Sequence, residues 1–309
     1  MLRILVVIAA LCLLLLMTTP LRAATCEANM SDIDFGAVSL RSGEVNRTSG
    51  TLTVTCAGLL NETVGVCLRF GAGSGGAGPG NAPRFMSGPT GQSLAYQLRL
   101  GGHGAVHGTL NEVYLPVAVV SSAGQVTIPI YAELLANGTE FVTGAYQSTF
   151  SGLPHIEMSY GIVSCELFGQ SHPVSDFAVS AQTVASCELD VGSLDFGQIS
   201  NLAAPADATA AVDIRCTSGT GYSVSMGLGD GPGVSDPALR RMQGALGTLA
   251  YGLYRDPARS LVWGEAANQR NSATGTGYGQ RFTVYGRIHA GQQAPAGSYG
   301  DSVVVTVHY

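Results

Sequence analysis

The chain contains two copies of one sequence pattern, and this duplication constrains its fold more than any other feature. In each copy a Cys-Glu pair precedes an Asp-Phe-Gly motif, with nine residues from the cysteine to the phenylalanine. A second cysteine ends an alternating run 21 residues beyond the phenylalanine in the first copy and 20 in the second. The matched positions are Cys26, Phe35 and Cys56 in the first copy and Cys187, Phe196 and Cys216 in the second.

Further matches follow in the same order along the chain, which indicates two domains of one type. They pair Arg84-Phe85-Met86 with Arg241-Met242, Leu94-Ala95-Tyr96 with Leu249-Ala250-Tyr251, Gly144-Ala145-Tyr146 with Gly297-Ser298-Tyr299, and Ser159-Tyr160 with His308-Tyr309. We therefore predict a first domain over residues 24–170, a connecting segment over 171–185 and a second domain over 186–309.

Short alternating runs separated by Gly, Pro, Asn and Ser clusters predict an all-β fold for each copy. Residues 302–309 show the pattern, because valines alternate there with polar residues as in a half-buried strand. Glycine makes up 42 of the 309 residues, which is typical of a protein with many turns and bulges. The fold class expected is two tandem β-sandwiches.

The first 23 residues have the features of a secretory signal peptide. Arg3 precedes an apolar run over Ile4–Met17, and small residues follow at Ala23 and Ala24. The run is shorter than the roughly 20 residues that span a bilayer, so we expect an exported protein whose mature part is soluble. Loss of Arg3 and Arg22 shifts the net charge from −6 to −8. This acidic balance argues against nucleic acid as a partner.

Six cysteines remain after the signal peptide, and an even number in an exported chain indicates disulfides. The most economical pairing joins Cys26 to Cys56 and Cys187 to Cys216, and each bond closes a loop of about 30 residues. We expect Cys67 to pair with Cys165. A zinc site is the alternative for the last two, but no close Cys/His pairs accompany them.

The Cys…Asp-Phe-Gly…Cys pattern, the Leu-Ala-Tyr strand and the closing Gly-x-Tyr…Val-x-Tyr segment resemble the spore coat protein U domain family. This domain is the pilin module of archaic, Csu-type chaperone-usher pili, and two modules in one chain resemble the tip adhesin of such a pilus. The resemblance implies immunoglobulin-like sandwiches that lack their last strand. It also implies strand exchange with a periplasmic chaperone and then with the next pilin subunit's N-terminal donor strand, at an outer-membrane usher.

Two segments fit this implied assembly. The sequence ends after an alternating strand, so we expect the second domain, which lacks its last strand, to present an open acceptor edge at Val303, Val305, Val307 and Tyr309. Between the copies, Phe177, Val179, Ala181 and Thr183 alternate as a donor strand would. Either this strand or the run over 162–168 beside Cys165 would complete the first domain internally. A plain linker is the remaining interpretation.

A tip adhesin would contact a biotic or abiotic surface through loops of its first domain. The candidate loops span residues 71–83, 101–110 and 134–141. Their candidate contact residues are Val106, Leu110, Leu134, Leu135 and Phe141. The predicted location is the pilus tip of a Gram-negative bacterium, reached through the periplasm, with a role in attachment and biofilm formation.

Other classes of function have less support in the sequence. His103 and His107 lie in a glycine-rich segment where no helix would align them for metal binding, and no nucleophile or phosphate-binding motif is present. We therefore expect no enzyme activity, no metal and no cofactor. The alternative function is a secreted spore-coat or lectin-like structural protein.

Overall fold

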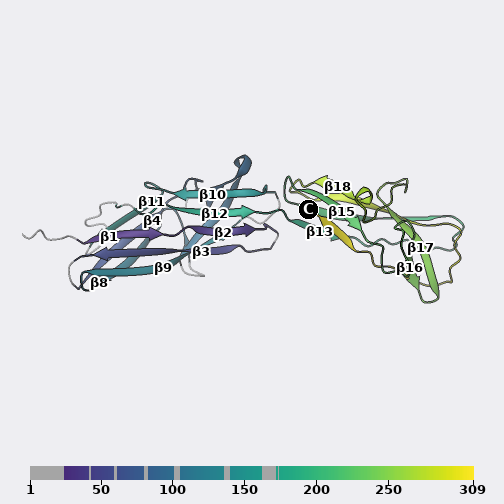
Figure 1. Cartoon of the computed structure of the whole chain (residues 1–309), viewed down its shortest axis with the longest axis horizontal. Helices are drawn as coiled ribbons and strands as arrows, with labels where there is room; N and C mark the ends of the chain where they lie inside the picture. Colours follow the sequence, from purple (N-terminus) through teal and green to yellow (C-terminus); the bar gives the residue numbers. More distant parts are fainter. Residues whose placement is uncertain are drawn as a thin grey trace, which may run out of the picture.

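The computed structural model describes residues 24–41, 43–58, 61–79, 83–100, 105–135, 140–161, 172 and 174–309. Two β-sandwiches lie end to end in it (Figure 1). Within these ranges there is no α-helix, and the two single-turn 3-10 helices are η1 (Pro89–Gly91) and η2 (Ala267–Gln269). None of the helices described is long and apolar enough to cross a membrane. The expected all-β class with two tandem sandwiches is confirmed.

The first sandwich consists of a nine-stranded sheet facing a three-stranded sheet. The large sheet has the order β1 (Thr25–Met30), β3 (Arg47–Ala57), β9 (Ala123–Leu134), β6 (Ser93–Leu100), β5 (Arg84–Ser87), β10 (Gly144–Phe150), β12 (Phe177–Thr183) and β2 (Ile33–Val38), with β7 (Val106–His107) beside β6. The small sheet has the order β11 (Ile156–Gly161), β4 (Glu62–Phe70) and β8 (Glu112–Val119). Alternate side chains of both sheets form one core between them.

The second sandwich repeats this plan with fewer strands. Its large sheet has the order β13 (Cys187–Val191), β14 (Ala206–Cys216), β19 (Gln280–Ile288), β17 (Gly247–Tyr254), β16 (Arg240–Gly244) and β20 (Tyr299–Gly300). Its small sheet has the order β18 (Asn271–Thr274), β15 (Gly221–Met226) and β21 (Val305–His308). A separate core lies between these two sheets and includes the chain's single tryptophan, Trp263.

The segment between the two copies is part of the first domain's sheet. β12 runs antiparallel to β10 and parallel to β2, and it lies between them (Figure 1). Phe177, Val179, Ala181 and Thr183 are all buried. Phe177 stacks on Phe150 with ring centroids 4.5 Å apart. Residues 177–183 are therefore not a free linker, whereas the alternative run over 162–168 lies outside the described residues.

The Asp-Phe-Gly motif forms the same turn in both domains. Gly36 has φ +65° and Gly197 has φ +68°, a left-handed conformation that favours glycine. The backbone N–H of each glycine donates to the preceding aspartate, at 3.0 Å to Asp34 Oδ1 and 2.8 Å to Asp195 Oδ1. The aspartate thereby holds the turn by an Asx hydrogen bond.

Each domain contains one fully buried arginine that binds backbone carbonyls. Arg84 donates to the carbonyls of Phe70, Gly71 and His107, and burial lowers its pKa to about 10. Arg240 donates to the corresponding carbonyls of Met226, Gly227 and Trp263. The sequence match of Arg84 with Arg241 is therefore wrong by one position. The strand pairing aligns Arg84 with Arg240, because these residues face Tyr96 and Tyr251 respectively.

Two disulfides join the first strand of each domain to the strand that carries the second cysteine. Cys26 bonds to Cys56 across β1 and β3, and Cys187 bonds to Cys216 across β13 and β14. In both pairs the cysteines are directly opposite in the strand register. Cys67 is also disulfide-bonded. Its expected partner, Cys165, lies outside the described residues.

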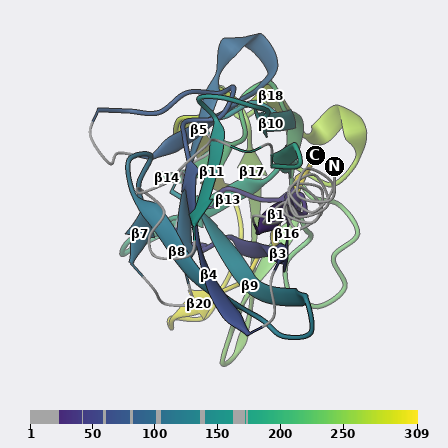
Figure 2. The same cartoon turned by 90° about the vertical axis from the view of Figure 1, so that its left-hand side faces the viewer.

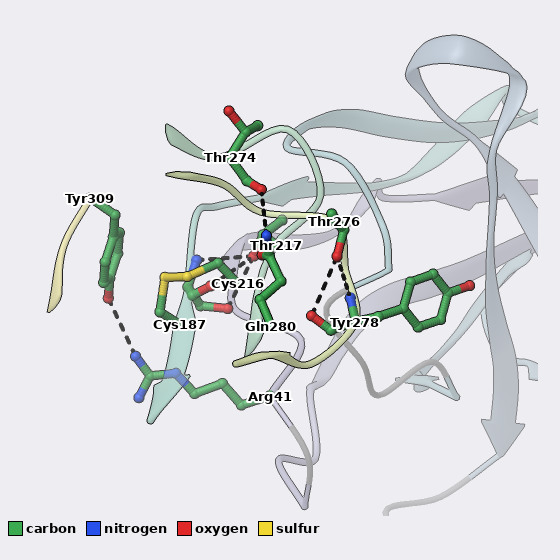
Figure 3. The surroundings of a disulfide bond; sticks show 10 residues. Arg41, Cys187, Cys216, Thr217, Thr274, Thr276, Tyr278, Gln280 and Tyr309 are labelled. Atoms are coloured by element: carbon green, nitrogen blue, oxygen red, sulfur yellow. Dashed lines mark hydrogen bonds between the residues drawn. A yellow bond between two sulfur atoms is a disulfide. The ribbon is translucent and has the colours of Figure 1, made fainter. Parts of the chain in front are cut away.

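The domains meet through short contacts close to the second disulfide. Arg41 of the first domain donates to the Tyr309 hydroxyl at 3.5 Å, and both side chains lie beside Cys187–Cys216 (Figure 3). Val142 forms a β-bridge with Ser218. Only residues 184–186 separate β12 from β13. The loops around Val142 therefore lie at the junction of the two domains.

We predict that Phe177→Ala destabilises the first domain by about 3 to 5 kcal/mol, because it removes a buried ring stacked on Phe150. Hydrogen–deuterium exchange of the full mature chain, followed by mass spectrometry, would show faster exchange in β2 and β10. Gln182→Ala, an exposed position of the same strand, is the control and should leave exchange unchanged. Equal protection in both variants would contradict a structural role for β12.

Candidate functional site

The second domain has an uncovered groove where the first domain has β12. The counterparts of β10 and β2 are residues 297–303, which contain β20, and residues 194–199. In the described structure no strand lies between these two segments, and residues 192–199 form no strand themselves. A cavity of about 290 Å³ opens between them and is lined mainly by apolar side chains, which include Leu194, Phe196, Leu253, Tyr299, Val303 and Val305.

Two residues of the predicted acceptor edge, Val303 and Val305, line the cavity. Val303, Val305 and Val307 are partly buried and pack against the second core, and Tyr309 is 57% exposed. By the strand pairing, Ile156 and Met158 are the counterparts of Val305 and Val307. The counterparts in the first domain are buried. β21 pairs with β15 on one side only.

The opposite wall belongs to β13, the first strand of the second domain. Leu189 is 38% exposed and Val191 is 44% exposed, whereas their counterparts Ala28 and Met30 are buried. In the first domain the chain just before β12 covers the corresponding strand, β1. Val174 forms a parallel bridge with Ala28, and the Ser175 hydroxyl accepts the Met30 N–H. The groove in the second domain therefore continues along β13.

Asp195 of the second domain is the counterpart of an aspartate that contacts β12 in the first domain. The Ser180 hydroxyl of β12 donates to Asp34 Oδ1 at 2.9 Å, and the Ala178 N–H donates to Asp32 Oδ1 at 2.7 Å. Asp195 matches Asp34 and lines an adjoining hollow, which shares Leu194, Phe196 and Tyr299 with the cavity. Asp34 therefore binds the inserted strand as well as shaping its turn, a role that the sequence analysis did not assign to it.

A second carboxylate, that of the partly buried Asp301, lines the groove. Its Oδ2 accepts the Tyr251 hydroxyl at 2.6 Å, and its Oδ1 accepts the N–H groups of Asp230 and Ser302 at 2.8 and 2.9 Å. Burial and this hydrogen bond to Asp301 both raise the pKa of Tyr251. Three hydrogen bonds thus hold the carboxylate in place beside the apolar lining.

The candidate surface-contact residues lie in different environments. Leu134 is buried in β9, so it is not available to a surface, and Phe141 is partly buried against the core and Tyr146. Leu135 is 39% exposed and directly follows β9. Val106 is 37% and Leu110 is 71% exposed. Val106 lies in β7, and Leu110 lies in the turn that connects β7 to β8, two strands that are labelled in Figure 2.

The histidines do not form a metal site in the part of the chain that is described. His107 is buried with Arg84 bound to its carbonyl, and burial lowers its pKa to about 4. His103 lies outside the described residues. No group of three or more His, Cys, Asp or Glu side chains in the described ranges is arranged to hold a metal ion.

Both copies of the repeat match the model of one known family. The family model of the spore coat protein U domain matches residues 13–152 and again 174–306. The chain belongs to the spore coat protein U domain family. Protein U of Myxococcus xanthus is 33% identical to this chain over 129 residues, which are 38% of this chain and 72% of that protein.

The two-domain arrangement also has a counterpart among solved structures. One chain in the crystal structure of the CsuC–CsuE chaperone–tip adhesion subunit pre-assembly complex, from the archaic chaperone-usher Csu pili of Acinetobacter baumannii, aligns with a TM-score of 0.55. The alignment has 16% sequence identity and covers 92% of this chain and 100% of that chain. This member of the spore coat protein U family therefore has the fold of a chaperone-usher pilus subunit with two domains.

We predict that Tyr251→Phe destabilises the second domain by about 1.5 to 3 kcal/mol, because a hydrogen bond to the Asp301 carboxylate is lost in a buried place. Trp263 is fully buried in this domain, so its fluorescence during urea unfolding reports on the second domain alone. Tyr278→Phe changes a hydroxyl that is largely exposed and should leave the midpoint unchanged. Equal midpoints for both variants would exclude a stabilising role for Tyr251–Asp301.

Proposed function

We propose that this protein is the tip subunit, an adhesin, of an archaic chaperone-usher pilus. The observation that carries the proposal is the difference between the two domains. The first is completed by its own strand β12, and the second has an apolar groove at the equivalent place. A subunit with one closed and one open domain can end a fibre, because only one of its domains needs a strand from another molecule.

The open groove defines the partners in this proposal. A periplasmic chaperone would insert a strand during export, since an apolar groove and an unpaired strand edge aggregate if left uncovered. At the outer-membrane usher, the N-terminal donor strand of the next pilin subunit would replace it. Strand addition supplies backbone hydrogen bonds along the edge and apolar contacts for alternate side chains.

The first domain would then contact a biotic or abiotic surface and support biofilm formation. Its sheet is complete, so it has no need of a donor strand. Of the candidate contact residues, Val106 and Leu110 are exposed and close in sequence, on the turn between β7 and β8. Exposed apolar side chains at one place favour contact with another surface.

A second candidate function is an exported structural protein of a spore coat or similar layer. The name of the family and the similarity to Protein U favour it. A stable monomer in the absence of any chaperone would support this candidate, and a chaperone gene and an usher gene beside this one would support the pilus.

Coexpression with a periplasmic chaperone tests the pilus proposal. We expect the wild-type chain to copurify with the chaperone in a 1:1 complex, and Val303→Asp to lose the complex, because it puts a charge in the apolar groove. Val304 is the adjacent residue and is 70% exposed, so Val304→Asp is the matched control and should keep the complex. Equal recovery of both variants would contradict strand exchange at this groove.

Attachment assays test the role of the first domain. We expect Val106→Asp with Leu110→Asp to reduce biofilm formation on plastic at least several-fold, with pili still assembled. Leu153→Asp alters an exposed residue at another place in the first domain and is the control. Normal attachment by the double variant would exclude the turn after β7 as the contact surface.

A further inference from the structure

The lining of the groove differs between the two domains at one polar position. Tyr146 in β10 matches Tyr299 in β20, so Ser148 matches Asp301, two residues further along. Ser148 is fully buried and lies directly opposite Val179 of the neighbouring strand β12. Asp301 lines the open cavity. A neutral hydroxyl beside the internal strand is thus replaced by a carboxylate beside the place for an external one.

The β12 register shows which residue of an inserted strand would face Asp301. Val179 is the partner of Ser148 across the β10–β12 pair, and both side chains point into the core. A strand inserted in the same register would place its equivalent of Val179 over Asp301. The following residue, equivalent to Ser180, would face Asp195, as Ser180 faces Asp34.

A valine at that place would cover the carboxylate with methyl groups. A carboxylate has about four positions that accept a hydrogen bond. Three donors occupy three of these positions on Asp301, which leaves one. Covering the remaining position without a donor costs free energy, whereas a hydrogen bond to a charged group gains it.

We propose that Asp301 determines which strand the second domain accepts. The inference rests on the proposed function. The partner is an extended segment of another pilin subunit, and it carries a side chain that donates a hydrogen bond, such as threonine, opposite Asp301. Its next residue is a serine or threonine opposite Asp195. The internal strand β12 has Val179 at the position opposite Asp301. It therefore fits the first domain better than it would fit the second domain.

Peptide binding to the full mature chain tests this selectivity. The probes are a synthetic peptide with the sequence of residues 172–184 and its Val179→Thr variant, which is nearly isosteric and adds one hydroxyl. We expect the threonine peptide to bind wild-type protein about tenfold more tightly than the valine peptide. The measurement is the peptide concentration needed to raise the unfolding midpoint of the second domain, followed by the fluorescence of Trp263. An Ala181→Thr peptide adds the hydroxyl at the next inward position and should gain nothing.

Asp301→Ser introduces the residue of the first domain and should abolish the preference for threonine. If this variant does not fold, the comparison of the peptides on wild-type protein still decides the question. Equal affinity of the valine and threonine peptides for wild-type protein would overturn the role of Asp301 and leave strand acceptance standing. Failure of every peptide to bind, including at millimolar concentration, would overturn both.

Discussion

The pairing of β12 with β10 and β2 is the interaction on which the first domain depends. Without that strand, β10 and β2 would each have an unpaired edge, and the core would lose the buried side chains of β12. The strand satisfies backbone groups on both sides, and Phe177 and Val179 fill the space between the sheets. Backbone pairing and apolar burial therefore come from one segment, which lies after the rest of its domain in the sequence.

The second domain shows what the same framework looks like without that strand. Leu189, Val191 and Tyr309 are substantially exposed, and residues 192–199 form no strand because no partner lies beside them. Burying a valine or leucine side chain contributes about 1.5 to 3 kcal/mol. Several such side chains line the groove, so a docked strand would gain enough to offset the entropy of ordering it.

The two domains share a framework, although only the first contains an inserted strand. The disulfides join directly opposed cysteines, and the buried guanidinium groups of Arg84 and Arg240 each bind carbonyls from separate segments of the chain. None of these contacts involves a residue of β12, so an empty groove is compatible with an ordered domain. The two domains share this plan and differ at Ser148 and Asp301, and under the proposed function this difference would make the groove a selective acceptor.

The sequence by itself determined the duplication, the all-β class and the pairing of Cys26 with Cys56 and Cys187 with Cys216, because cysteine spacing and strand alternation are local patterns. It also indicated that residues 177–183 alternate as a strand. Only the tertiary structure decided that this strand lies between β10 and β2, that Leu134 is buried and Phe141 partly buried, and that Asp301 lines the groove. The reason is physical: burial and strand neighbours depend on contacts between residues far apart in the chain, such as Val179 with Ile33, and alternation alone does not specify which edge a strand joins.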